Sequence, residues 1–288
     1  MEKSRTPSWP RGFATAATAA RVIAFRRVGS PPTTYFRNTE GARGEINRWT
    51  SAATHRRVPQ LLRPGAIGEL TRLVLVDALV ADARWATSFD PARTHPQEFT
   101  TLGGAVESIP MMVAESIQRF GRADAYDAVD LACADEEHAL LIIAPTPGHF
   151  DEVDAALDLD GFDRIVASLA RGRVIVSMPR FRASLPPTSL TSALHALGIT
   201  RAFDKGANLE GISRDPDSRL SVGDVVHTAT IDVDESGARA AAATGVIIGL
   251  PAPVPPITPI TINRPFLFWL RNVRTGTPIV MGRFMGGP

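Results

Sequence analysis

Apolar positions along the chain mostly follow the continuous and alternating patterns that are typical of β-strands. The run LTRLVLVDALV at 70–80 is almost continuously apolar, which predicts a central strand buried on both faces. Polar turns separate further strand-like runs, which lie at 99–102, 106–112, 128–134, 138–145, 173–181 and 225–234. The pattern therefore predicts a chain built mainly around sheets.

Three stretches carry the wider spacing of amphipathic helices. Residues 38–54 place Ile46, Trp49 and Ala53 on one stripe, and a second helix is predicted at 151–169. A third stripe precedes a glycine stop at Gly198 and consists of Leu190, Ala193, Leu194 and Leu197. Helices added to strands predict the α+β class.

The strands are predicted to form two sheets. We expect the strands near 70–80, 173–181 and 225–234 to share one sheet. The segments Phe266 to Leu270 and Ile279 to Phe284 are dense in apolar residues and are joined by a short TGTP turn. They are predicted to pair in a second, more buried sheet.

The stretch 235–268 combines features of a strand and of an exposed loop. Alternation places small or apolar residues on one face, namely Ala238, Ala240, Ala242, Thr244, Val246, Ile248 and Leu250. Alanine and glycine hold a strand poorly by local preference, so a larger sheet must accept this one. Prolines begin at Pro251, and because they cannot donate to a ladder, any insertion is predicted to stop near Leu250.

Two motifs stand out near the C-terminus: Glu235 and Gly237, followed by an alanine run and Thr244, and NRPFLFWLRNVRTGTPIVMGRFMGGP at 263–288. They resemble the hinge and the closing signature of the serpins, a family of serine protease inhibitors. Other matching segments follow the family's order: INRWTSAAT (46–54), TRLVLVDALVADARW (71–85), IPMM (109–112), VSMPRF (176–181), ALHALGITRAF (193–203) and VVHTATIDVDESG (225–237). The resemblance covers the chain from about Tyr35 to its end.

The resemblance implies a serpin-like α+β fold. It would have a large mixed β-sheet with packed helices, a second buried sheet and an exposed reactive loop. The family's N-terminal helices and two strands of its main sheet have no counterpart in this sequence. Residues 1–34 stay unassigned and are interpreted as a disordered or misassigned start, and residues 35–288 as a serpin-like domain that is incomplete at its N-terminal side.

The resemblance also implies three groups of functional residues. The hinge comprises Glu235, Gly237, Ala238, Ala240, Ala241, Ala242, Ala243 and Thr244. The sheet-opening region comprises Asp77, Trp85 and His227, and Asp77 stands where the family usually has asparagine. Counting from Glu235 places the reactive bond between Pro251 and Ala252, whereas counting back from Pro265 places it between Val254 and Pro255; Pro251–Ala252 is the prediction.

The function implied is inhibition of a serine protease as a suicide substrate. The protease would attack the exposed loop, and the cleaved hinge would insert into the main sheet before water releases the acyl-enzyme. The alternative is a non-inhibitory serpin remnant or binding module that is cleaved without trapping a protease. No G-x-S-x-G, H-E-x-x-H, G-x-G-x-x-G or P-loop pattern occurs, so an enzyme is not expected.

Composition narrows the range of partners. The formal net charge is +1, from 31 basic and 30 acidic residues, so no general attraction to nucleic acid or to a membrane surface is expected. A single cysteine, Cys133, excludes an internal disulfide and a multi-cysteine metal site, and no cofactor is predicted. No apolar run approaches the roughly 20 residues that span a bilayer, so a soluble protein is expected.

No compartment is predicted. Serpins are often extracellular, but Arg21 interrupts ATAATAARVIAF, which makes this segment a poor secretory signal.

Overall fold

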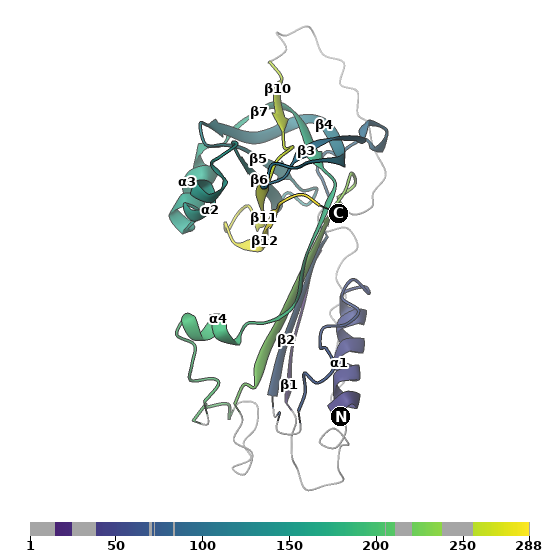
Figure 1. Ribbon diagram of the computed structural model, residues 1–288, viewed down its shortest axis with the longest axis vertical. Coiled ribbons are helices and arrows are strands. Elements are labelled where there is room, and N and C mark those ends of the chain that lie inside the picture. The colour runs from purple at the N-terminus through teal and green to yellow at the C-terminus, as the bar shows by residue number, and fades with distance from the viewer. Residues whose placement is uncertain are drawn as a thin grey trace. The chain divides into compact units, whose positions relative to one another are not determined.

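A computed structural model describes the chain in segments (Figure 1). The described residues are 15–24, 39–68, 71, 73–82, 84–204, 206–210, 221–237 and 256–287. They belong to two compact units. Unit 1 includes the described residues within Ala81–Ala183 and Asp232–Pro288, and unit 2 includes those within Ala16–Val80 and Ser184–Ile231.

Unit 2 contains most of a four-stranded sheet. Its strands, in spatial order, are β1 (Thr15–Ala24), β2 (Leu73–Asp82), β9 (Asp224–Val233) and β8 (Phe181–Ser189). The helix α1 (Thr39–Ala53) packs against this sheet, as Figure 1 shows, and the short helix α4 (Thr191–Ala196) follows β8. A buried cluster joins α1 and the segment after it to β2 and β9, and it includes Ala42, Ile46, Leu61, Leu62, Val74, Val76 and Val226.

Unit 1 contains a mixed eight-stranded sheet. Its spatial order is β10 (Thr258–Thr261), β7 (Ala170–Pro179), β4 (Val106–Ala123), β5 (Tyr126–Ala132), β6 (His138–Pro145), β11 (Phe266–Asn272) and β12 (Pro278–Phe284), and β3 (His95–Thr100) also pairs with β4. The pairing of β10 with β7 is parallel, whereas β4 pairs with β7 in the antiparallel sense. A 3₁₀ turn, η2 (Pro91–Arg93), precedes β3.

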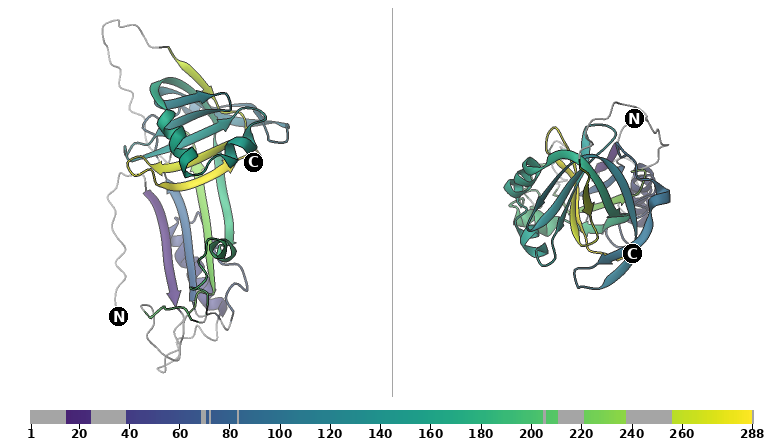
Figure 2. Two further views of the ribbon diagram at one scale, coloured as in Figure 1. Left: turned by 90° about the vertical axis from the view of Figure 1, so that its left-hand side faces the viewer. Right: turned by 90° about the horizontal axis from the view of Figure 1, so that it is seen from above.

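Two kinds of packing fill unit 1. One is a cluster of aromatic rings with neighbouring centroids 5.2 to 5.5 Å apart, formed by Phe99, Phe181, Phe266, Phe268 and Phe284. The other lies where α2 (Phe150–Ala155) and α3 (Leu159–Ser168) cover one face of the sheet (Figure 2). Trp269 and Leu267 of β11 pack there with Phe150 and Ile165.

The α+β class with two sheets is confirmed, and so is the pairing of the last two strands. Phe266 lies opposite Phe284, and Trp269 lies opposite Met281. The segment 173–181 was assigned to the wrong sheet. Most of it forms β7, which pairs with β4 and β10 in the eight-stranded sheet.

The sequence pattern did not predict two strands of the four-stranded sheet: β1, which lies within the unassigned residues 1–34, and β8. The strand β8 contains Pro186 and Pro187, which weaken any strand signal. An edge strand tolerates proline because half of its backbone N–H groups have no ladder partner, and β8 is at the edge of its sheet.

The predicted helices are present, with one change. The helix at 38–54 corresponds to α1, but the stretch 151–169 forms two helices. Asp158 begins the second one as its N-cap, accepting a 2.8 Å hydrogen bond from the backbone N–H of Gly161. Gly161 permits this close turn because a Cβ atom there would lie 2.0 Å from the carbonyl oxygen of Ala156.

Candidate functional site

Glu235 is held tightly just after β9 ends. Its side chain is 9% exposed, and its Oε1 accepts 2.7 Å hydrogen bonds from Thr94 Oγ1 and from Arg180 Nη2. Its backbone carbonyl accepts a 2.9 Å hydrogen bond from the N–H of Phe89. The chain is therefore fixed, by both side chain and backbone, at the base of the predicted hinge.

The electrostatics of this contact favour the ionised carboxylate. Burial by itself would raise the pKa of Glu235, but hydrogen bonds from Arg180 and Thr94, together with the charge of Arg180, lower that pKa below its usual value. The same hydrogen bond, which Arg180 donates to Glu235, raises the pKa of Arg180. The pair therefore stays ionised at neutral pH.

A tight turn follows β9 and contains Glu235. Asp234 Oδ1 accepts hydrogen bonds from the N–H of Ser236 (2.9 Å) and from its hydroxyl (2.8 Å). Gly237 N–H donates back to the carbonyl of Asp234 at 3.2 Å, and the φ angle of Gly237 is +73°, where glycine carries no steric penalty. This turn is the last described part of the chain before residue 256.

Trp85 supports the turn from the end of β2. Its Nε1–H donates a 2.8 Å hydrogen bond to the carbonyl of Asp234, and its ring meets that of Phe89 edge-on, with centroids 6.0 Å apart. Trp85 and Phe89 border a narrow cleft with Gln118 and Val176 that is too small to admit a water molecule. Trp85 is therefore a packing residue that also fixes the backbone before Glu235.

His227 and Asp77 form a separate contact in unit 2. Nδ1 of His227, on β9, donates to Oδ2 of Asp77, on β2, at 2.7 Å. These strands are neighbours in the four-stranded sheet, so the pair joins them by a side-chain contact. The side chains are partly exposed, at 22% for His227 and 36% for Asp77.

The remaining predicted residues lie outside the described part of the chain. They are Ala238, Ala240, Ala241, Ala242, Ala243 and Thr244 of the hinge, and Pro251 and Ala252 of the reactive bond.

Sequence reasoning named Glu235 but missed its partners. Arg180 and Thr94 are 55 and 141 residues away from Glu235 along the chain. Arg180 does lie within the VSMPRF segment that carries part of the family resemblance, and that was the one available signal. Thr94 follows a 3₁₀ turn in an otherwise polar segment, and nothing in its surroundings indicated a contact with the hinge.

The described residues contain neither a candidate metal site nor a helix that could cross a membrane. No group of three or more histidine, cysteine, aspartate or glutamate side chains there is arranged to hold a metal ion. Among the helices of the same residues, none has both the length and the apolar character required to cross a membrane.

Known proteins with similar sequences include members of the serpin family. Antithrombin-III of Mus musculus is 31% identical over 255 residues, covering 88% of this chain and 55% of the mouse protein. An uncharacterized serpin-like protein of Thermococcus kodakarensis is 32% identical over 250 residues, covering 86% of this chain and 57% of that protein. The chain thus spans about half the length of these curated relatives.

Solved structures show the same fold. Native protease nexin-1 with heparin aligns with a TM-score of 0.79 at 25% identity, covering 95% of this chain and 78% of that one. Uncleaved ovalbumin aligns with a TM-score of 0.81 at 21% identity, covering 96% and 75%, which supports the fold alone. The family model described as "Serpin (serine protease inhibitor)" matches residues 29–286, and with this match over most of its length the chain belongs to the serpin family.

Proposed function

We propose that this chain belongs to an inhibitor of a serine-type endopeptidase and acts as a suicide substrate. Residues 238–255 are the reactive loop, with the hinge at its start and the reactive bond between Pro251 and Ala252. The observation that carries the proposal is the anchoring of Glu235. It fixes the chain at the end of β9, and the chain next appears in β10 at the edge of the other sheet.

The covalent step uses the chemistry of the protease. Its serine Oγ attacks the carbonyl carbon of Pro251, the C–N bond to Ala252 breaks, and the new amine leaves with a proton supplied by the protease histidine. The protease is then joined to Pro251 through an ester. Hydrolysis of this ester would free the enzyme, so the inhibitor must change shape first.

The shape change is insertion of the hinge between β2 and β9. A chain that turns back after β9 runs antiparallel to it. In the sheet, β9 lies between β2 and β8, and the proposed opening is on the β2 side, where Asp77 and His227 of the predicted sheet-opening region meet. The inserted strand gains ladders on both of its sides, which stabilises the product. Small residues suit the hinge because each one passes into a packed sheet.

One observation favours the alternative, a non-inhibitory serpin that is cleaved without trapping a protease. The Asp77–His227 contact joins the two strands that must separate. A hydrogen bond to a carboxylate is about twice as strong as one between neutral groups, so Asp77 opposes opening more than an amide would. Slower opening gives water more time to release the acyl-enzyme.

Incubation with a panel of trypsin-like, chymotrypsin-like and elastase-like proteases tests the proposal. A complex that survives denaturing electrophoresis and contains both the protease and residues up to Pro251 is the expected result. Mass spectrometry of the released C-terminal peptide identifies the cleaved bond and separates Pro251–Ala252 from Val254–Pro255.

Ala240→Pro is the matched control, because it leaves the reactive bond unchanged but removes a ladder donor from the hinge. This variant is expected to be cleaved without forming a complex. Cleavage of the unmodified chain with no complex from any protease would refute the inhibitor and support the alternative. Asp77→Asn then shows whether the carboxylate is responsible, since its removal should restore some complex.

A further inference from the structure

The strand β10 is weakly held by its own ladder. It has four residues, it lies at the edge of the eight-stranded sheet, and among the described strands it pairs with β7 alone. Pro259 lies within it and has no N–H to donate. Ile260 and the adjacent Ile262 are fully buried, but so short a strand needs additional contacts to stay in place.

The two sides of β10 carry different backbone groups. Ile262 N–H donates a 2.7 Å hydrogen bond to Ser177 of β7, so the even-numbered residues direct their backbone groups towards β7. Pro259 and Thr261 therefore direct theirs towards the free edge. No strand of the described residues lies on that side to donate hydrogen bonds to their carbonyl oxygens.

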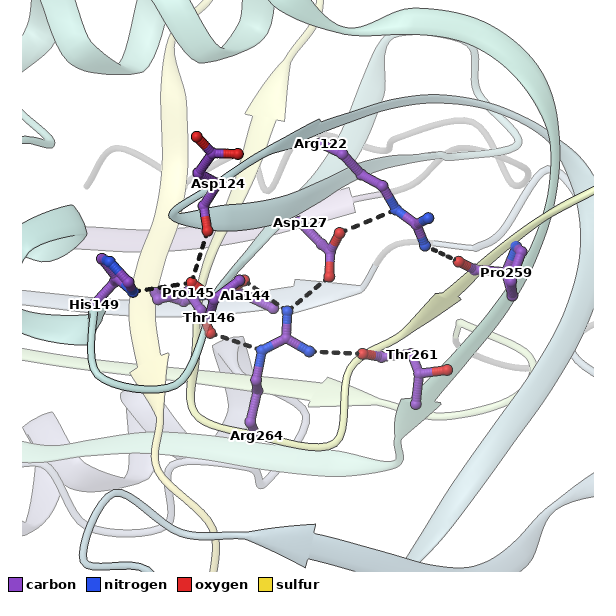
Figure 3. A network of polar contacts seen from close by, with 10 residues as sticks. All are labelled: Arg122, Asp124, Asp127, Ala144, Pro145, Thr146, His149, Pro259, Thr261 and Arg264. Atoms are coloured by element: carbon purple, nitrogen blue, oxygen red, sulfur yellow. Dashed lines mark hydrogen bonds and ion pairs between the residues drawn. The ribbon is translucent and has the colours of Figure 1, made fainter.

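Arg264 donates a hydrogen bond to one of these two carbonyl oxygens and also to neighbouring strands (Figure 3). Its Nη1 donates to the carbonyl of Thr261 at 3.1 Å, and its Nε donates to the carbonyl of Pro145 at 2.6 Å. Its Nη2 donates to the carbonyl of Ala144 at 3.1 Å and to Asp127 Oδ2 at 2.7 Å. One guanidinium, 16% exposed, thus connects β10 to the ends of β5 and β6.

Arg122 extends the same network to the other free carbonyl. It donates through Nη2 to the carbonyl of Pro259, and its Nε lies 3.1 Å from Asp127 Oδ1. Asp127 therefore lies between the two guanidinium groups, as Figure 3 shows, and each of its oxygens meets one of them. Arg122 is 51% exposed, so water competes for its contacts and its contribution is the smaller one.

We propose that Arg264, together with Asp127 and Arg122, holds β10 on the eight-stranded sheet and so fixes the chain at the C-terminal side of the proposed reactive loop, residues 238–255. These are positioning residues, because they act on the backbone of β10. Arg264 is the principal one, since it is the more buried arginine and donates to three backbone carbonyls and one carboxylate.

The functional consequence rests on the proposed inhibitory role. A loop tethered at both ends presents its reactive bond to a protease only while both ends hold. Glu235 holds the incoming end, and this arginine network holds the outgoing one. If β10 separated from β7 before cleavage, the C-terminal end of the proposed loop would no longer be held, and no protease would be trapped.

Hydrogen exchange of the intact chain, followed by mass spectrometry, tests the inference without any protease. Arg264→Met keeps the length and the apolar stem of the side chain but removes all its donors. Exchange of the β10 amides, in a peptide covering 256–262, is expected to become at least about tenfold faster, as expected when a charge-assisted hydrogen bond is lost. Exchange in β11 should stay unchanged.

Three further variants make the result decisive. Arg122→Met should accelerate β10 exchange about twofold to threefold, because its contacts are more exposed. Asp127→Asn should have an intermediate effect and keeps the test valid if Arg264→Met does not fold. Arg283→Met is the matched control, since it removes an exposed arginine that pairs with Asp154 from β12 of the same sheet.

Unchanged exchange at β10 in Arg264→Met and Asp127→Asn would overturn the proposal. Equal acceleration at β10 and β11 would also overturn it, because the network would then support the whole unit and not this strand. Failure to trap any protease leaves the exchange result intact and refutes only the proposed function.

Discussion

Replacing Glu235 by alanine is predicted to destabilise unit 1, and to do so less at acidic pH. The substitution removes two 2.7 Å hydrogen bonds, from Thr94 and from Arg180, at a side chain that is 9% exposed. A neutral hydrogen bond contributes about 1 kcal/mol and one between charged groups about 1.5 to 3 kcal/mol. Arg180 is 52% exposed and can regain water, which places the charged contact at the lower end.

The expected loss for Glu235→Ala is therefore about 2 kcal/mol at pH 7. At about 2 to 4 °C per kcal/mol, this lowers the melting temperature by about 4 to 8 °C. Glu235→Gln keeps an oxygen that can accept from Thr94 and loses only the charge. It should cost about half as much, about 1 kcal/mol.

The pH dependence follows from the lowered pKa of Glu235. Because the folded state binds this proton less readily than the unfolded state, the contribution is fully present above the unfolded pKa of about 4.3. It is lost as pH falls through the lower, folded pKa. The difference between the unmodified chain and Glu235→Gln should therefore shrink below about pH 4.

Urea unfolding followed by circular dichroism at pH 7, 5 and 3 measures these differences. Glu137→Ala is the matched control, because Glu137 pairs with Arg274 at a surface where their side chains are 50% and 75% exposed. Its expected cost is below about 1 kcal/mol at every pH. If Glu235→Ala cost no more than Glu137→Ala at pH 7, the inferred anchoring of the hinge base would be refuted.

Three other predictions concern stability and reactivity. Gly282→Ala should destabilise the chain by about 1 to 3 kcal/mol in urea unfolding, because its Cβ would lie 2.6 Å from the ring of Phe268; a neutral result would mean that the aromatic cluster can rearrange. Asn47→Ala should cost about 3 kcal/mol, since the buried amide accepts from two backbone N–H groups and donates to the carbonyl of Leu62; a loss under about 1 kcal/mol would contradict this. Cys133 should resist iodoacetamide at pH 8 until the chain is unfolded, because burial and then the charges of nearby aspartates raise its pKa to about 12; rapid labelling of the folded chain would disprove it.

Local patterns in the sequence were sufficient for several features. The apolar run at 70–80 predicted a strand, which is present as β2, and the dense apolar segments near the C-terminus predicted the pairing of β11 with β12. Because the turn between β11 and β12 is short, these two strands are brought together as a hairpin and pair with each other. The spacing of Ile46 and Trp49 predicted α1 for a similar reason, because helical contacts lie within four residues of each other.

The choice of sheet was decided by the tertiary structure. The pattern in 173–181 shows that the segment is extended, but alternation carries no information about which distant strand will pair with it. In the fold, β7 lies between β4 and β10. The proline-containing β8 occupies the position in the four-stranded sheet that was predicted for 173–181. Pairing depends on backbone groups of segments far apart in the chain, and these are the same in every residue except proline.

For the candidate sites, too, the motifs identified individual residues, whereas the tertiary structure decided their partners. The motifs identified Glu235 and Gly237 as hinge residues, and Arg264 lies within the closing signature at 263–288. Only the fold places Arg180 and Thr94 on Glu235, or the carbonyls of β6 and β10 around Arg264. A side chain's local sequence indicates whether it can donate or accept, whereas its partners are set by long-range packing that no short pattern records.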